Sequence, residues 1–237
     1  MGKLYEGKAK EVYETEDPRK VILRFKDTAT AFDGVKKAEL RGKGELNCAI
    51  TSALFQLLGE KGIKTHFIKR VSPTEILVWK AKPFAVEVVV RNIATGSVVK
   101  RLGLEEGKRF KKPLVELFYK KDELHDPLVC EAHVELLGLA PIEHLPYMKG
   151  VALEVNEVLK VFFANRGLEL VDFKLEFGKL SDGSVALIDE LSPDSMRLWD
   201  AKSGEKLDKD RFRYDLGDLL EGYKEILRRI NTVANIS

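Results

Sequence analysis

The chain has 237 residues, 44% hydrophobic and 33% charged, the composition of a globular protein that buries one substantial core or a core split between two lobes. Forty basic residues against 38 acidic ones give a formal net charge of +2, which argues against a nucleic-acid-binding protein coated with positive charge. Because the sequence has neither the apolar start of a secretory signal nor a run of 18 uncharged apolar residues, we expect a cytoplasmic protein that does not span a membrane.

The rare residue types exclude some chemistries. Cys48 and Cys130 lie far apart without CxxC or CxxH spacing, so neither structural zinc nor a disulfide is expected. The four histidines are scattered and form no tight ligand motif. Gln56 is the single glutamine beside many Lys and Glu, a bias typical of proteins from hot environments.

The first half of the chain reads mainly as short strands. Alternating or apolar segments predict strands at Lys3–Glu6, Ala9–Thr15, Val21–Phe25, Thr65–Lys69, Ile76–Lys80 and Ala85–Arg91. Between them, apolar residues recur at helical spacing over Gly44–Lys61, and Gly62 stands where a helix commonly ends.

The second half adds longer helices. Helical spacing covers Lys149–Arg166 and ends at Gly167, and a β-hairpin is predicted over Leu168–Leu191. A final helix is expected from Asp208 to about Ile230, with Leu216 among its inward-facing residues. Strands first and helices later predict an α+β fold with a β-rich N-terminal lobe and a ligand site in the cleft between lobes.

The predicted hairpin carries an unusual pair of acids. Strand alternation places Val171, Phe173, Leu175 and Phe177 on one face and Asp172, Lys174 and Glu176 on the other. A two-residue turn at Asp182-Gly183 would then pair Glu176 directly with Asp189. Because like charges opposite each other destabilise a sheet, a cation is expected there, and two carboxylates suit Mg²⁺.

A second interpretation of this hairpin remains open. The charged face would be solvated, with its carboxylates partly balanced by Lys174 and Lys179. The metal hypothesis also depends on the turn, since a slip of one residue would undo the pairing.

Three further segments have the residue types of anion-binding sites. Glu6–Lys10 places a glycine between charged residues at a turn that would cover a polyphosphate, or it is an exposed hairpin turn. Arg91–Ser97 ends a strand with a guanidinium and a Thr-Gly-Ser turn, fit for a phosphate, or it is a plain connection. Ser192–Asp200 offers Arg197 to an anion, or it is a surface loop held by Trp199.

Taken together, these segments resemble the SAICAR synthetase (phosphoribosylaminoimidazole-succinocarboxamide synthase) family. The matching stretches, in the family's order and across nearly the whole chain, are KLYEGKAKEVY, VEVVVRNIATGS, VDFKLEFG, LIDELSPDSMRLWD and LDKDRFR. A small departure is Ile188, which stands before Asp189 in place of glycine.

The resemblance implies an activity and a fold. The reaction would be ATP + CAIR (carboxyaminoimidazole ribonucleotide) + L-aspartate giving SAICAR, ADP and phosphate in purine biosynthesis, with Mg²⁺. The fold would have a nucleotide lobe like that of protein kinases at residues 1–81 and a larger α+β lobe at residues 82–237, with ATP in the cleft. A homodimer is expected by the same analogy, with no nucleic-acid partner.

The resemblance also implies roles for individual residues. ATP phosphates would lie near Lys8 and Lys10, and adenine near the hinge residues Lys82, Val86 and Glu87. Glu176 and Asp189 would hold Mg²⁺. The imidazole nucleotide would contact Arg91, Ser97 and Arg197. Asp126, Lys174 and Lys209 would lie in the active site as catalytic residues.

The chemistry agrees with what the sequence lacks. If ATP phosphorylates the carboxylate, no protein nucleophile is needed, and no Ser/His/Asp or Cys/His signature is present. A small-molecule kinase and a non-catalytic nucleotide sensor are the alternatives. Aspartate-dependent phosphate release would separate the ligase from the kinase, and a sensor would have no need of the metal pair.

Overall fold

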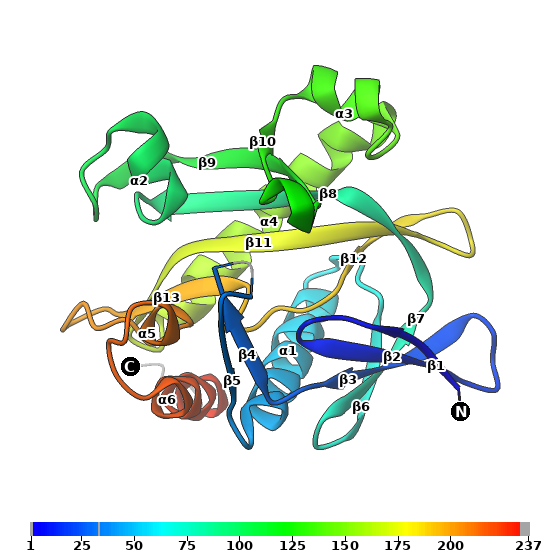
Figure 1. Ribbon diagram of the computed structural model, residues 1–237, viewed down its shortest axis with the longest axis horizontal. Helices are drawn as coiled ribbons and strands as arrows, with labels where there is room; N and C mark the ends of the chain where they lie inside the picture. Colours follow the sequence, from blue (N-terminus) through cyan, green and yellow to red (C-terminus); the bar gives the residue numbers. More distant parts are fainter. Residues whose placement is uncertain (1, 33, 233–237) are drawn as a thin grey trace.

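The computed structural model describes residues 2–32 and 34–232, and the sheets in this part of the chain are antiparallel (Figure 1). The N-terminal sheet has the order β1-β2-β3-β7-β6. Its strands are β1 (Lys3–Glu6), β2 (Lys10–Glu14), β3 (Lys20–Phe25), β7 (Glu75–Trp79) and β6 (Phe67–Ser72). A separate hairpin, β4 (Thr28–Ala31) with β5 (Lys36–Glu39), follows β3 along the chain.

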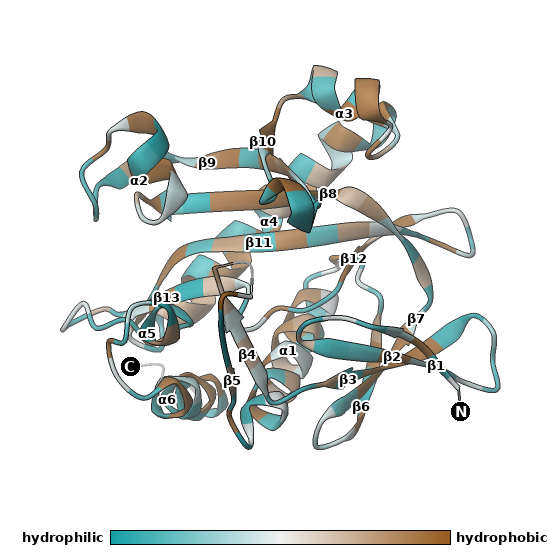
Figure 2. Cartoon of the chain, in the orientation of Figure 1, coloured by the Kyte–Doolittle hydropathy of each residue, from teal (hydrophilic) through white to brown (hydrophobic). Residues whose placement is uncertain are grey.

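The second sheet has the order β10-β9-β8-β11-β12, with β13 also paired to β11. Its strands are β8 (Ala81–Ile93), β9 (Arg109–Tyr119), β10 (Leu128–Val129), β11 (Leu168–Leu180), β12 (Val185–Ile188) and β13 (Met196–Asp200). β8 and β11 are long neighbours at the centre of this sheet, and both hydrophobic and hydrophilic bands cross β11 (Figure 2). The α+β class expected from the sequence is confirmed.

Helices cover the sheets and connect them. They are α1 (Lys43–Glu60), α2 (Ser97–Leu102), α3 (Glu131–Leu137), α4 (Leu145–Ala164), α5 (Asp210–Arg213) and α6 (Leu219–Asn231), with 3₁₀ turns η1 (Asp122–Leu124) and η2 (Ile142–His144). α4 packs on β8 and β11, because Met148, Val155 and Leu159 on one of its faces are fully buried. Among the described residues, none of these helices is both long enough and apolar enough to cross a membrane.

The buried apolar side chains form a main core and a smaller one. The smaller core lies under the N-terminal sheet, around Leu23 and Val78. The main core joins α4 and the second sheet to one face of α1, through Ile50 and Leu54. Ile50 and Leu54 of α1 therefore belong to the main core although α1 precedes residue 81 in the chain, and the helix also lies against β3 and β6 of the N-terminal sheet.

The predicted pairing of Glu176 with Asp189 is wrong. Glu176 lies opposite Ile188, and Asp189 falls beyond the last residue of β12. The turn has three residues in place of two, because Leu180 N–H donates to Ser184 O at 2.8 Å and Gly183 takes a left-handed φ of 85°. Asp-Gly suits both loop lengths, and the extra residue shifts the register by one.

The prediction of a single final helix from Asp208 to about Ile230 is also wrong, because two helices, α5 and α6, occupy this range. The backbone breaks between α5 and α6, where Asp215 has φ 53° and Gly217 φ 138°, both outside helical values. Asp218 restarts the helix as an N-cap that accepts from Leu220 and Glu221 N–H groups. Leu216 lies in the break and is 51% exposed, so it does not face inward.

Candidate active site

Two acids lie directly opposite each other on the neighbouring strands β8 and β11. They are Glu87 and Glu176, in place of the predicted pair Glu176 and Asp189. Lys174 bridges them, with its Nζ 2.7 Å from Glu87 Oε1 and 3.1 Å from Glu176 Oε1. Lys120, after β9, donates to the other oxygen of Glu176. Glu87 is 6% exposed and Glu176 4%, so the solvated-face interpretation is wrong for these carboxylates.

A second lysine–carboxylate group forms where β12 ends. Lys10 Nζ lies 2.9 Å from Asp189 Oδ1 and also contacts Glu190 Oε1. Asp189 has a left-handed φ of 69°, an uncommon backbone for a residue other than glycine. Ser192 donates its hydroxyl to the second oxygen of Glu190. The first residue of β2 is thereby joined to the loop that follows the second sheet's edge strand.

The two groups are coupled electrostatically. Burial disfavours ionisation of Asp189, but Lys10, and after it Lys174 and Lys120, hold its pKa below the usual range. Burial likewise opposes charge on Lys174, yet Glu176 and Glu87 keep its pKa well above the ordinary value. At neutral pH Lys174 is thus protonated and Asp189 ionised. Glu176 and Asp189 share the influence of the same lysines, so they face one site despite the shifted register.

The donor set fits a magnesium ion that arrives with a polyphosphate. Mg²⁺ commonly takes one or two carboxylates and completes its shell with phosphate oxygens and water, and Glu176 and Asp189 supply that number. Within the described ranges, no group of three or more His, Cys, Asp or Glu could hold a metal by itself. The protein therefore offers part of a metal shell, next to the lysines expected to meet phosphate.

The predicted substrate residues Arg91, Ser97 and Arg197 come together around one carboxylate. Arg91 Nη1 and Arg197 Nη1 each lie 2.8 Å from Asp172 Oδ2. Arg91 also donates to Ser97 Oγ at 3.2 Å and to Glu116 Oε2 at 2.7 Å. Guanidinium groups anchored in this way can receive a phosphate or carboxylate without first losing side-chain freedom.

Gly96 makes room for this arrangement. It precedes α2 with φ 64° and ψ −135°, a backbone region that is essentially limited to glycine. A Cβ at this position would lie 2.7 Å from Arg197 Nη2. On its other side, Arg197 donates from Nε to Asp210 Oδ2 at 2.9 Å.

The remaining nucleotide-site predictions are placed less directly. Lys8, in the turn between β1 and β2, forms an ion pair of 2.9 Å with Asp122 of η1. The carboxylates that contact Lys10 are different ones, Asp189 and Glu190. Lys82 is exposed and lies opposite Lys179 of β11. Val86 is fully buried in the main core, so only its backbone could meet a nucleotide.

Asp126 and Lys209 approach the site from opposite ends. Asp126 accepts a hydrogen bond of 2.7 Å from Lys121 N–H. Burial raises the pKa of Glu87, and the negative charge of Asp126 also raises it. Burial lowers the pKa of Lys209, and Asp194 partly opposes this. Lys209 thus lies near Asp194, beside the Lys10 group rather than beside Lys174.

Sequence reasoning missed a polar stripe on α1. Lys43, Asn47 and Thr51, spaced by four residues, are almost fully buried. Lys43 Nζ and Asn47 Nδ2 donate to Asp194 Oδ2, and Thr51 Oγ1 donates to Leu191 O. The stripe holds the loop between β12 and β13, just before the strand that carries Arg197. The available signal was the spacing of four residues between these polar side chains.

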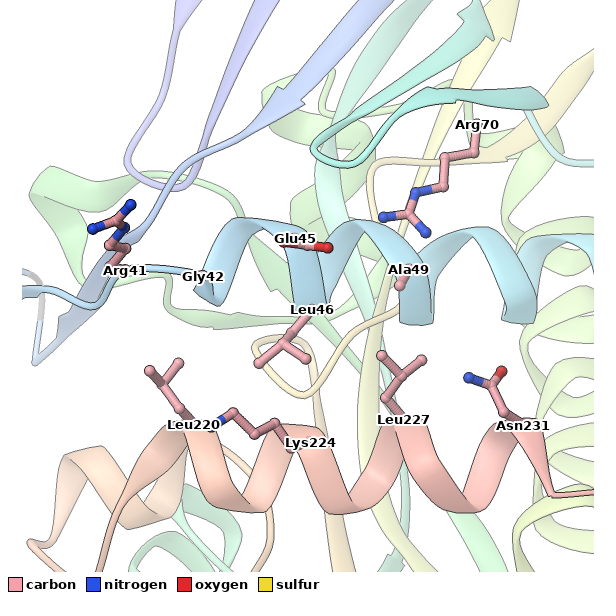
Figure 3. A pocket seen from close by; sticks show the side chains of 10 residues that line it. All are labelled: Arg41, Gly42, Glu45, Leu46, Ala49, Arg70, Leu220, Lys224, Leu227 and Asn231. Carbon is pink, nitrogen blue, oxygen red and sulfur yellow. The ribbon is translucent and has the colours of Figure 1, made fainter.

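A groove of about 400 Å³ lies elsewhere, between α1 and α6 (Figure 3). Leu46 of α1 and Leu220 and Leu227 of α6 point into it, with Arg41 and Arg70 at its rim. The predicted site residues do not line this groove. It is therefore separate from the lysine, carboxylate and arginine groups described above.

Lysines among carboxylates, beside anchored arginines, define an enzyme that handles phosphorylated substrates. The SAICAR synthetase family model matches residues 3–230, and the chain belongs to this family. The phosphoribosylaminoimidazole-succinocarboxamide synthase of Persephonella marina is 60% identical over 228 residues, covering 96% of this chain and 95% of that protein. The one from Aquifex aeolicus is 61% identical over 203 residues, covering 86% and 94%.

Solved structures agree with this assignment. A SAICAR synthetase (type-2) in complex with ADP superposes with a TM-score of 0.93 at 51% identity, covering 96% of this chain and 97% of that one. The enzyme from Ehrlichia chaffeensis gives a TM-score of 0.94 at 45% identity, covering 99% and 100%. The family resemblance inferred from five sequence segments is confirmed.

Proposed function

We propose that this protein joins L-aspartate to the carboxylate of CAIR, using ATP, and forms SAICAR, ADP and phosphate in purine biosynthesis. Family membership and a neighbour that binds ADP support the proposal. The observation that carries it is the spacing on β11, where Asp172, Lys174 and Glu176 share one face. Two residues along a strand span about 7 Å, so the arginine site and the lysine–carboxylate site are neighbours.

The chemistry needs such neighbours. A carboxylate does not react with an amine in water, because oxide is a poor leaving group. Transfer of the γ-phosphoryl group from ATP to a carboxylate oxygen of CAIR releases ADP and gives an acyl phosphate. The aspartate amine then attacks the acyl carbon, phosphate leaves, and the nitrogen loses a proton. Holding the reactants in place can supply about 7–11 kcal/mol of the barrier reduction.

Arg91, Ser97 and Arg197 are proposed to bind the phosphorylated imidazole nucleotide. Both guanidinium groups are fixed by Asp172 before a ligand enters, and each has five N–H donors, more than Asp172 alone can accept. Two-pronged donors match the geometry of phosphate oxygens. In this proposal the CAIR carboxylate would point toward Lys174, which follows Asp172 on the same face of β11.

Lys10 and Lys174 are proposed to stabilise negative charge on the migrating phosphoryl group, with Lys8 near the ATP phosphates. Glu176 and Asp189 would hold Mg²⁺, which supplies positive charge to the polyphosphate. Their carboxylates already lie among lysines, so exchange of an ammonium contact for the metal needs little rearrangement.

The other predicted residues keep their proposed places. Lys82, Val86 and Glu87 would border adenine in a cleft between lobes at residues 1–81 and 82–237. Asp126 and Lys209 would face the aspartate substrate from either side of the phosphoryl group. A homodimer in the cytoplasm completes the proposal, and sedimentation of the purified protein measures the oligomeric state.

Oxygen-18 in the CAIR carboxylate tests the phosphoryl route. If that carboxylate is phosphorylated, one labelled oxygen appears in the inorganic phosphate released with SAICAR. Unlabelled phosphate together with labelled SAICAR would show that the carboxylate is not activated in this way.

A further inference from the structure

His66 is a buried histidine that the proposed reaction does not use. It is 4% exposed and stands just before β6, in the N-terminal half of the chain. Its Nε2 lies 3.3 Å from the backbone oxygen of Asp189. Because a carbonyl oxygen only accepts, the ring must carry its proton on Nε2 to make this bond.

The backbone around His66 is joined to β12 immediately before Asp189. His66 N–H donates to Leu187 O at 2.9 Å, and Leu187 N–H donates to Lys64 O at 3.1 Å. Thr65 and Leu187 form a parallel bridge. These bonds fix β12, but they end two residues before Asp189. The imidazole ring extends the same connection to the carbonyl oxygen of Asp189.

The ring itself has little freedom. It packs edge-on against Phe55, with ring centroids 5.5 Å apart and an interplanar angle of 85°. His66 O accepts from Trp79 N–H at 2.7 Å, which holds the backbone on the other side. A donor fixed by its own surroundings can hold a strained neighbour in place.

Asp189 is such a neighbour. Its φ of 69° is disfavoured for a residue with a side chain, and such a backbone persists only where its surroundings hold it. Its carbonyl belongs to the peptide group that joins Asp189 to Glu190. Orienting that peptide therefore sets the directions of two carboxylates, both of which contact Lys10.

We infer that His66 is a positioning residue, whose Nε2–H fixes the Asp189–Glu190 peptide so that the Asp189 carboxylate points toward the metal and Glu190 toward Lys10. The inference rests on the proposed role of Asp189 as a Mg²⁺ ligand. His66 touches neither substrate nor metal in this scheme. It acts through the backbone of the residue that does.

Substitutions at His66 separate the hydrogen bond from packing. A glutamine can place an amide N–H where Nε2 lies, whereas the shorter asparagine cannot and leucine has no donor. We therefore expect His66→Gln to retain the function and both His66→Asn and His66→Leu to lose it. Phe55→Leu is the matched control, because it removes the ring that packs on His66 and leaves the Nε2 donor of His66 in the chain.

The readout is the gain in ADP affinity that Mg²⁺ provides, measured by calorimetry with and without the metal. His66→Leu and His66→Asn should reduce that gain about three- to tenfold, the usual effect of one lost hydrogen bond. ADP affinity without metal should stay unchanged. Equal gains in all variants would overturn the inference, as would a His66→Gln variant that loses as much as His66→Leu.

Asp189→Asn in the same assay separates this inference from the proposed function. If Asp189→Asn keeps the full gain, the metal role of Asp189 is wrong. If Asp189→Asn loses the gain while His66→Leu keeps it, only the role of His66 is wrong. Should His66→Leu fail to fold, the comparison of glutamine with asparagine decides alone, since both are uncharged amides.

Discussion

Arg91 and Arg197 donate to the same oxygen, Oδ2 of Asp172, each over 2.8 Å. The two arginines come from β8 and β13, on opposite sides of β11, which carries Asp172. Two guanidinium groups so close would repel each other without the carboxylate between them. Asp172 thus allows two cations to lie side by side, where we propose that they bind one ligand.

Replacement of that carboxylate should damage substrate binding. In Asp172→Asn the arginines lose their shared charged acceptor. Because a hydrogen bond to a charged group contributes about 1.5–3 kcal/mol, we expect KM for CAIR to rise at least about tenfold. Steady-state kinetics with saturating ATP and aspartate measure it. Asp200→Asn is the control, because Asp200 pairs with Arg229 away from the site at 2.6 Å. Equal KM values in both variants would contradict the assignment.

Gly96→Ala should displace Arg197. The added Cβ would lie 2.7 Å from Arg197 Nη2, so we expect a several-fold rise in KM for CAIR as well as a loss of about 1–3 kcal/mol from backbone strain. Gly103 ends the same helix with φ 61°, and a Cβ added there would have no neighbouring atom within 4 Å. Gly103→Ala should lower stability by about 1–2 kcal/mol and leave KM unchanged. A normal KM in Gly96→Ala would show that Arg197 tolerates displacement.

Tyr223 links α6 to Asp194, in the loop between β12 and β13. Its fully buried hydroxyl donates to Asp194 Oδ1 at 2.6 Å, so Tyr223→Phe leaves a buried carboxylate with one donor fewer. The free energy of unfolding should fall by about 1–3 kcal/mol. Tyr147→Phe is the control: Tyr147 is 44% exposed with a hydroxyl contact of 3.5 Å, and should change stability by less than about 0.5 kcal/mol. Urea denaturation that shows equal losses would contradict the role of the Tyr223 hydroxyl.

The stability of the fold should depend on pH through His66. Burial lowers the pKa of His66 to about 4, against an ordinary value of 6.5. Below pH 6.5 the unfolded chain binds a proton that the folded protein does not, so stability falls as pH falls toward 4. By pH 5 this contribution is about 2 kcal/mol. Denaturation curves at pH 7 and pH 5 should show that His66→Gln loses less stability than the parent protein between these two pH values. Equal losses in the two proteins would show that His66 is not the source of the pH dependence.

Local pattern predicted much of the fold. Alternation along β11 correctly assigned Phe173, Leu175 and Phe177 to the core, and helical spacing located α1 and α4. The hairpin turn could not be resolved, because Asp-Gly serves loops of two and of three residues. The break before α6 depends on left-handed backbone at Asp215, which a single sequence does not reveal.

The site was predicted less completely than the fold. Arg91 and Arg197 were selected, but Glu116 and Asp210, which help to anchor them, were not, since they lie 25 and 13 residues away on other elements. The acid that faces Glu176 is Glu87, and that pairing of β8 with β11 is a long-range choice. Lys43 and Asp194, 151 residues apart, show the same limit.

The ligase assignment depends on aspartate being required for turnover. The direct measurement is ADP release by the purified protein with ATP, Mg²⁺ and CAIR, with and without L-aspartate. We predict that ADP and SAICAR form together in equal amounts over many turnovers only when aspartate is present. ADP released at the same rate without aspartate would show a kinase or an ATPase, and would contradict the account.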